Sequence, residues 1–312
     1  MARVQDAGRT AAWHPVPRDP KARRDVLAIQ RSRAGILFSL PVVIVLGLLL
    51  LVPIAQAFYY SLTTWNGVTA TWVGIGAYVQ LVEDPTFWRV LLNNAGLLIA
   101  VPFAIAIPLG VAFLLNERVT GWKFFRSVYF LPTAISWVVI GMVAVRFFAY
   151  DGILNHIMAA LHLGLSQNML SGEYTAMIAV MITFIWSVFG TNTVIFITGM
   201  ATLDPELYEA ARVDGASSWQ VVRYITVPLL RRFIQFAFII TLITAFTALF
   251  SLIFVMTGGG PGYGTTTLEF FVYQEAFNVG DFGFGATLGV VLFLIVFAIS
   301  LMQLRILGRG DD

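Results

Sequence analysis

Six long apolar runs that contain no charged residue determine what this chain can fold into. A helix rises about 1.5 Å per residue, so about 20 such residues cross the roughly 30 Å hydrocarbon layer of a membrane. The fourth and fifth runs exceed one crossing, and we expect each to include an interfacial or loop portion. The sequence predicts an all-α integral membrane protein with six transmembrane helices, in the runs Ala34–Phe58, Val90–Asn116, Ser127–Val145, Tyr174–Leu203, Phe233–Leu268 and Phe282–Leu304.

The composition excludes an ordinary soluble domain. Of the 312 residues, 58% are hydrophobic and 12% are charged, and the mean hydropathy is +0.82. Soluble domains carry about 25% charged residues. Cysteine is absent, which excludes a disulfide framework and thiol catalysis.

The basic residues predict which side of the membrane each connection faces. All of the 19 lysines and arginines except Arg89 and Arg146 precede the first run, follow the last, or lie in the second and fourth connections between runs. Basic residues concentrate on the cytoplasmic side. We therefore expect a multi-pass protein with both termini in the cytoplasm. Residues 1–33 are basic and proline-containing, and we interpret them as a mobile cytoplasmic tail, although attraction to anionic lipid is an alternative.

The segment 203–232 is the long polar interval on the predicted cytoplasmic side. Asp204 can cap a helix whose first residue is Pro205, where the missing N–H costs nothing. Gly215 can take the positive φ that ends a helix. Ser217 or Ser218 can cap a second helix that stops near Pro228. The pattern predicts two short helices, joined at a glycine, that form a compact knob.

The segment contains Glu-Ala-Ala, then Asp-Gly-Ala, then Ile-Thr-Val-Pro. With this order and spacing it resembles the loop by which permease subunits of ABC importers dock onto their ATPase. Val227 replaces the leucine usual in the family, and Arg232 stands where a second proline is often found. The resemblance implies that the loop couples transport to the ATPase; the alternative is an ordinary cytoplasmic helical hairpin. The residues that carry the resemblance are Glu209, Ala210, Ala211, Asp214, Gly215, Ala216 and the run Ile225–Pro228.

Two further stretches resemble permeases of carbohydrate importers, FWRVLLNN at 87–94 and FSLIFVMTGGGPGYGTTTLEFFVYQEAF at 250–277. Ser251 departs from an aspartate common in that family. The resemblance covers residues 34–306 and implies the MetI-like fold of type I ABC importers, in a bacterial or archaeal plasma membrane. It also implies a sugar substrate, a second homologous permease, two ATPase subunits and an external solute-binding protein. Whether the second permease is a copy or a different chain, and which sugar is carried, stay open.

The sequence contains no motif typical of catalysis, phosphate binding or metal binding. The glycine-rich run Gly258–Gly262 has no following Lys-Ser/Thr, so it does not predict a phosphate loop. His156 and His162 lie six residues apart, about 240° around a helix, so they do not form a zinc pair. We expect no catalytic residue, metal site or nucleic-acid partner. ATP and magnesium are expected on the partner ATPase and no cofactor on this chain.

Polar side chains in the fourth and fifth runs are candidates for a substrate pathway. Thr241, Thr244, Thr247 and Ser251 fall within about 120° of one helix face. Together with Thr191 and Asn192 they could bind a neutral polyhydroxyl solute, which needs hydroxyl and amide partners and no fixed charge. The alternative is that these groups bond to helix carbonyls or to neighbouring spans.

Other functions compete with the importer. An ion-driven secondary transporter commonly carries carboxylates or histidines within its spans, and the six runs contain neither. A membrane scaffold without transport has no need for a polar interior. An anionic solute such as a glycerol phosphate stays possible if Arg89 or Arg146 faces the pathway.

Overall fold

The computed structural model describes residues 38–116, 122–162 and 168–308, so the prediction for the basic tail 1–33 lies outside the described part of the chain. The chain divides into two compact units between Gln56 and Ala57. The described part of the first unit is helical from Phe38 and contains the π-helical turn η1 (Gly47–Leu51), which leads into α2 (Val52–Tyr60). The second unit carries everything that follows.

Within the described residues, five helical segments are long and apolar enough to cross a membrane, and a bent pair of helices makes up to six. The two parts of the bent pair, Ser218–Leu229 and Arg231–Thr247, meet at 75°. The predicted all-α membrane fold is confirmed. The five single segments are Phe38–Tyr60, Pro85–Leu115, Trp137–Ala160, Glu173–Met200 and Phe282–Gln303.

The first connection of the second unit forms a small hairpin and a short helix. Strands β1 (Thr63–Trp65) and β2 (Ala70–Trp72) pair antiparallel, and α3 (Gly76–Glu83) follows. The Asn66 side chain accepts hydrogen bonds from the backbone N–H groups of Val68 and Thr69 and so holds the turn.

The helix that leads into the second predicted span begins at a capped residue. Asp84 accepts a hydrogen bond of 2.8 Å from the Thr86 N–H, and proline follows at the first helical position of α4 (Pro85–Leu97). A turn at Leu98 and Ile99 separates α4 from α5 (Ala100–Asn116).

The third predicted span is not one helix, which corrects the sequence prediction. It is divided at Ile135 and Ser136 into α6 (Trp122–Ala134) and α7 (Trp137–Phe148). Pro132 cannot donate a backbone hydrogen bond, and the Ser136 hydroxyl accepts one from the Val138 N–H, which starts a new helix. The next helix along the chain is α8 (Ile153–Ala160).

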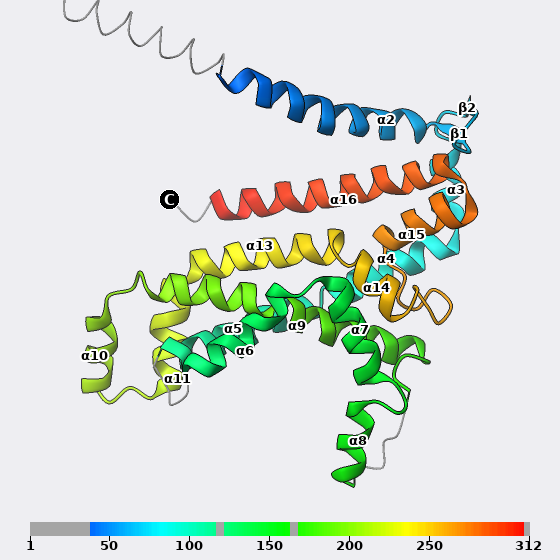
Figure 1. Ribbon diagram of the computed structural model, residues 1–312. Coiled ribbons are helices and arrows are strands. Elements are labelled where there is room, and N and C mark those ends of the chain that lie inside the picture. Colours follow the sequence, from blue (N-terminus) through cyan, green and yellow to red (C-terminus); the bar gives the residue numbers. More distant parts are fainter. Residues whose placement is uncertain (1–37, 117–121, 163–167, 309–312) are drawn as a thin grey trace, which may run out of the picture. The chain divides into compact units, whose positions relative to one another are not determined.

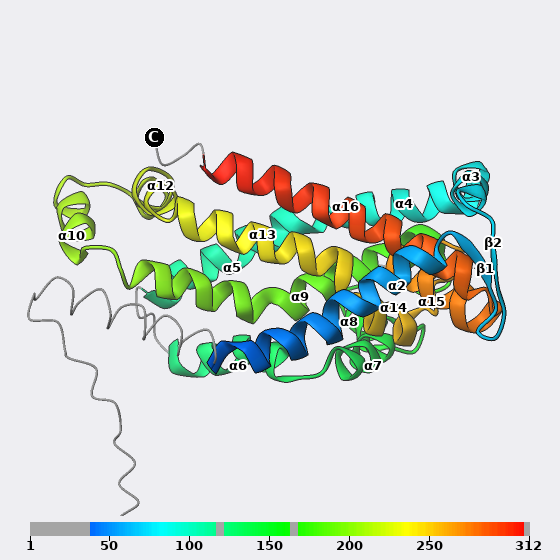
Figure 2. The ribbon, with the colours of Figure 1, turned by 90° about the horizontal axis from the view of Figure 1, so that it is seen from above.

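Helix α9 (Glu173–Met200) lies at the centre of the second unit. Helices α5, α6 and α13 (Arg231–Thr247) all contact it, and α5 and α13 run beside it in both views (Figures 1 and 2). Phe184 and Phe196 of α9 are completely buried. Gly190 lets α6 approach, because a Cβ there would lie 2.7 Å from the Tyr129 carbonyl oxygen.

The fifth predicted span is also broken. Helix α13 ends at Thr247, and α14 (Phe250–Met256) begins after Ala248 and Leu249. The chain then returns through residues 257–267 into α15 (Leu268–Tyr273) and the π-helical turn η3 (Gln274–Val279). The last span, α16 (Phe282–Gly308), is a single helix and packs against α15 and η3.

Candidate functional site

The polar segment 203–232 folds into the predicted pair of short helices. Helix α10 (Pro205–Val213) begins at Asp204, whose carboxylate accepts a 3.0 Å hydrogen bond from the Glu206 N–H. Helix α11 (Ser218–Val221) begins with a reciprocal cap, in which Ser217 and Gln220 each bond the other's backbone N–H. The π-helical turn η2 (Val222–Thr226) and α12 (Val227–Leu229) complete the segment, which we call the knob.

Gly215 ends α10 as the sequence predicts. Its φ of +78° is the left-handed conformation that favours glycine. The Gly215 N–H donates to the Arg212 carbonyl at 3.1 Å, and the Ala216 N–H donates to the Ala211 carbonyl at 2.9 Å. These two bonds form a Schellman motif, which satisfies carbonyls that a helix end otherwise leaves unpaired. The glycine therefore fixes the direction of the chain between α10 and α11.

The knob has an inner face and an outer face. Tyr208, Ala211 and Val221 are buried in the same hydrophobic core as α9 and α13. The predicted coupling residues Glu209, Ala210 and Asp214 are exposed instead. The outer face also exposes large apolar side chains, which often mark an interaction surface. These are Leu207, Val213, Trp219 and Tyr224.

The knob and the β1–β2 hairpin lie at opposite ends of the second unit (Figures 1 and 2). The long helices α9 and α13 run between these ends.

A polar cavity of about 260 Å³ lies where the two broken spans meet α9. Ile135 and Trp137 reach it from the break between α6 and α7, and Ala248 reaches it from the break between α13 and α14. Irregular backbone at membrane depth is tolerated where it is buried or lines a cavity. Each lining residue is uncharged: Pro132, Thr133, Ile135, Trp137, Ser187, Val188, Thr191, Asn192, Ile240, Thr241, Thr244 and Ala248.

Some of the predicted pathway residues meet in this cavity. Thr191, Asn192, Thr241 and Thr244 line it, whereas Thr247 and Ser251 are not among the lining residues. The predicted stripe assumed one continuous helix, and the break at Ala248 and Leu249 places Ser251 on α14 instead. Ser187, Thr133 and Trp137 line the cavity as well. Leu131-Pro132 was the signal in the sequence for a break at this point.

Asn192 is held by protein partners. Its amide donates to the Ala104 carbonyl at 2.7 Å and to the Thr241 hydroxyl at 3.0 Å. Both amide hydrogens are thereby occupied, and the residue is 1% exposed. Thr244 differs, because its hydroxyl donates to the Ile240 carbonyl at 2.7 Å and keeps lone pairs that can accept further bonds.

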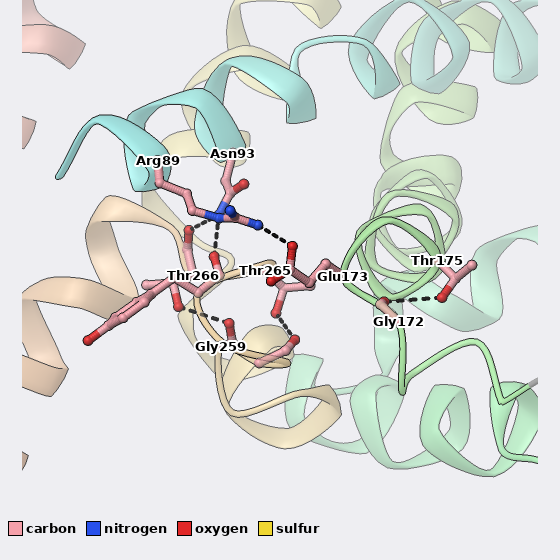
Figure 3. A network of polar contacts seen from close by, with 10 residues as sticks. Arg89, Asn93, Gly172, Glu173, Thr175, Gly259, Thr265 and Thr266 are labelled. Carbon is pink, nitrogen blue, oxygen red and sulfur yellow. Dashed lines mark hydrogen bonds and ion pairs between the residues drawn. The ribbon is translucent and has the colours of Figure 1, made fainter. Parts of the chain in front are cut away.

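The glycine-rich segment 257–267 is held against α4 and α9 (Figure 3). The Asn93 amide donates to the Tyr263 and Thr266 carbonyls at 2.7 and 2.9 Å. Arg89 forms an ion pair with Glu173, the first residue of α9. Arg89 is therefore already neutralised.

Neither arginine near the predicted outer side lines the uncharged cavity. Arg146 lines a separate pocket beside Asp151 and α8. Among the described residues, no group of three or more histidine, aspartate or glutamate side chains could hold a metal ion.

Glu269 was not among the site residues predicted from the sequence. Its carboxylate, which lies between the candidate spans, accepts hydrogen bonds of 3.0 Å from the backbone N–H groups of Leu249 and Phe250. Its one visible signal is an acidic residue placed directly after a long apolar run.

A bundle of broken membrane helices with a docked pair of short helices at one end defines the permease class of membrane transport protein. Residues 104–309 match the family described as "Binding-protein-dependent transport system inner membrane component". The chain belongs to this family.

Relatives and solved structures agree with this assignment. A probable ABC transporter permease of Pyrococcus horikoshii is 34% identical, over 89% of this chain and 96% of its own length. The sulfoquinovosyl glycerol transport system permease SmoG of Agrobacterium fabrum is 32% identical, over 89% of this chain and 91% of its own length. The crystal structure of a bacterial ABC transporter that imports alginate has a similar chain, with a TM-score of 0.74 at 23% identity, covering 91% of this chain and 99% of that one.

Proposed function

We propose that this chain is the membrane subunit of an importer that carries a neutral sugar or oligosaccharide. The observation that carries the proposal is the uncharged, hydroxyl-lined cavity at the junction of the two broken spans. Discontinuous helices build the substrate sites of many transporters. The printed names of two other relatives, the lactose permease LacF of Rhizobium radiobacter and the trehalose/maltose permease MalF of Thermococcus litoralis, support a neutral carbohydrate.

Hydroxyl groups in the cavity suit a sugar as a partner. Thr244 donates to its own helix, so its remaining lone pairs accept from a sugar hydroxyl. Thr191 is exposed and faces the same space. No lining residue carries a charge that would favour an anionic solute, and the pairing of Arg89 with Glu173 weakens the case for glycerol phosphates.

The knob is the proposed site for the ATPase. Its outer face combines Glu206 and Glu209 with the exposed apolar residues Val213 and Trp219. We expect two ATPase subunits, a second homologous permease and an external solute-binding protein, with ATP and magnesium on the ATPases. This chain itself performs no reaction.

The buried inner face of the knob provides the mechanical link. Tyr208 and Ala211 pack into the core that also contains residues of α9 and α13. Closure of the ATPases around ATP would move α10, and this packing would tilt the helices that line the cavity. The sugar would then enter from the side of the binding protein and leave at the end where the knob lies.

Two threonines on one helix test the proposed pathway. Thr244→Val removes a hydroxyl from the cavity, and Thr247→Val removes one outside it; both hydroxyls donate to carbonyls of α13, at 2.7 and 2.9 Å. In proteoliposomes that contain the purified transporter, the Thr244 variant should raise the KM for sugar uptake about tenfold, as expected for the loss of one or two hydrogen bonds. The Thr247 variant should not. Equal effects of the two variants would contradict the assignment of this cavity.

A further inference from the structure

The break in the fifth span is held from outside its own helices. Helix α14 has no side-chain cap of its own at Leu249. Glu269 of α15 supplies the missing acceptor, because one carboxylate oxygen lies 3.0 Å from the N–H of Leu249 and 3.0 Å from that of Phe250. Leu249 is completely buried, so no water reaches its backbone in place of Glu269.

The segment that carries Glu269 is itself fixed by two other helices. The Asn94 side chain of α4 accepts a 2.8 Å hydrogen bond from the N–H of Leu268, the residue before Glu269. On the same helix, Asn93 holds the chain at Tyr263 and Thr266 (Figure 3). Because these bonds fix α15, they also fix the carboxylate of Glu269.

Glu173 of α9 fixes the same segment from the other side. A Cβ on Gly264 would lie 2.8 Å from the Cβ of Glu173, so the glycine permits direct contact with the start of α9. The ion pair between Glu173 and Arg89 links α9 to α4 at this point (Figure 3).

The helix that Glu269 holds is also the partner of α7. A Cβ on Gly141 of α7 would lie 3.1 Å from the Cβ of Val255 on α14, so these two helices pack closely. Helices α7 and α14 are the second halves of the two broken spans. The residues at the two breaks, Trp137 and Ala248, both line the uncharged cavity.

We propose that Glu269 is a positioning residue that fixes the wall of the uncharged cavity at the two breaks. Its carboxylate fixes the position of the start of α14. Because α14 packs closely against α7 at Gly141 and Val255, the position of α7 depends on that of α14. Its importance for transport rests on the proposed function, in which the sugar passes through this cavity. Without the carboxylate, two backbone N–H groups lose their acceptor, which favours a shift of α14 and of Ala248.

A thiol introduced into the cavity wall reports this position. The chain has no native cysteine, so Ala248→Cys supplies the one thiol of this chain. The rate of its reaction with N-ethylmaleimide is measured in the purified transporter, alone and together with Glu269→Leu or Glu269→Gln. The matched control is Glu275→Leu, which removes an acidic side chain six residues further on, whereas the acceptor for the Leu249 and Phe250 N–H groups is Glu269.

We expect Glu269→Leu to change the reaction rate about tenfold and Glu269→Gln to change it less, since glutamine retains an acceptor oxygen. Glu275→Leu should leave the rate unchanged. The stacked and edge contacts of Phe250 with Phe254 and Tyr273 stay in every variant and support folding. Equal rates of thiol modification in the Glu269→Leu and Glu275→Leu variants, measured on folded transporter, would overturn the proposal. If Glu269 only supported folding, its loss would lower the yield of folded transporter and leave the reactivity of the thiol unchanged.

A second readout separates this inference from the proposed function. Bound sugar should slow the modification of the Ala248→Cys thiol in the otherwise unaltered transporter. A rate that responds to Glu269→Leu but not to sugar would support the positioning role and contradict the sugar pathway. The reverse result, with protection by sugar but no response to Glu269→Leu, would contradict the positioning role alone.

Discussion

Asn192 of α9 donates a 3.0 Å hydrogen bond to the hydroxyl of Thr241 on α13, and its second amide hydrogen goes to the Ala104 carbonyl of α5. One buried amide thus ties three of the long helices together beside the cavity. Asn192 and its neighbour Thr191 therefore have different surroundings. Asn192 is buried and bonded to protein partners, whereas Thr191 is exposed.

Replacement of Asn192 should therefore affect stability first. Asn192→Leu leaves a buried carbonyl and a buried hydroxyl without their donor, which should lower the free energy of unfolding by about 1–3 kcal/mol. Thr191→Leu should lower uptake without this loss. Thermal unfolding of both variants in detergent measures the difference.

The same pair allows a double-mutant cycle. The double variant Asn192→Leu with Thr241→Val should lose less free energy of unfolding than the sum of the two single variants. The reason is that both single changes remove the same hydrogen bond. Strict additivity would show that the Asn192–Thr241 bond contributes nothing.

A change at Gly215 should uncouple ATP hydrolysis from uptake. The φ of +78° strains a β-branched residue by about 1–3 kcal/mol. No atom lies within 4 Å of a Cβ built at Gly215, so within this chain the effect comes from the backbone rather than from a clash. Gly215→Val should abolish sugar-stimulated ATP hydrolysis, and Gly215→Asn should retain it, since asparagine tolerates this conformation. Identical hydrolysis in both variants would count against a role for the backbone conformation.

The ion pair between Arg89 and Glu173 should contribute little to stability. Its two side chains are 48% and 40% exposed, and exposed pairs contribute about 0–1 kcal/mol after solvent screening. Glu173→Gln should therefore lower the melting temperature slightly, and less in 1 M salt, where charges are screened over roughly 3 Å. The exchange of both residues, Arg89→Glu with Glu173→Arg, should restore part of the loss. A large loss that persists in high salt would mean that the pair acts through packing.

The sequence predicted the features that depend on local chemistry. Asp204, Pro205 and Gly215 define the ends of α10 through caps and one positive φ, all of which short-range rules describe. The long uncharged runs predicted the membrane helices for the same reason. For the ends of α10 and for the presence of membrane helices, composition and residue spacing were sufficient.

The breaks in the spans depend on contacts distant in the sequence. The break before Phe250 is stabilised by Glu269 nineteen residues later, and no local rule connects the two. The stripe of hydroxyls was predicted on one unbroken helix, whereas Ser251 lies on α14, beyond the break. For the same reason Glu269 itself was not found.

The orientation in the membrane gives a further prediction. Val68 in the hairpin turn is 88% exposed, and Val213 in the knob is 87% exposed. In intact cells an impermeant thiol reagent should label Val68→Cys from outside and leave Val213→Cys protected, because the basic residues predict a cytoplasmic knob. The absence of native cysteine makes the background low. The opposite labelling pattern would reverse the proposed topology.

ATP-driven uptake is the most direct test of the account, since it separates an ABC importer from a transporter driven by an ion gradient. The complex purified through this chain is placed in proteoliposomes with the solute-binding protein on the side of the β1–β2 hairpin. Labelled sugar should accumulate when ATP and magnesium are present on the side of the knob, and a proton or sodium gradient alone should give no uptake. Uptake driven by a gradient without ATP, or a purified chain that brings no ATPase with it, would contradict the central claim.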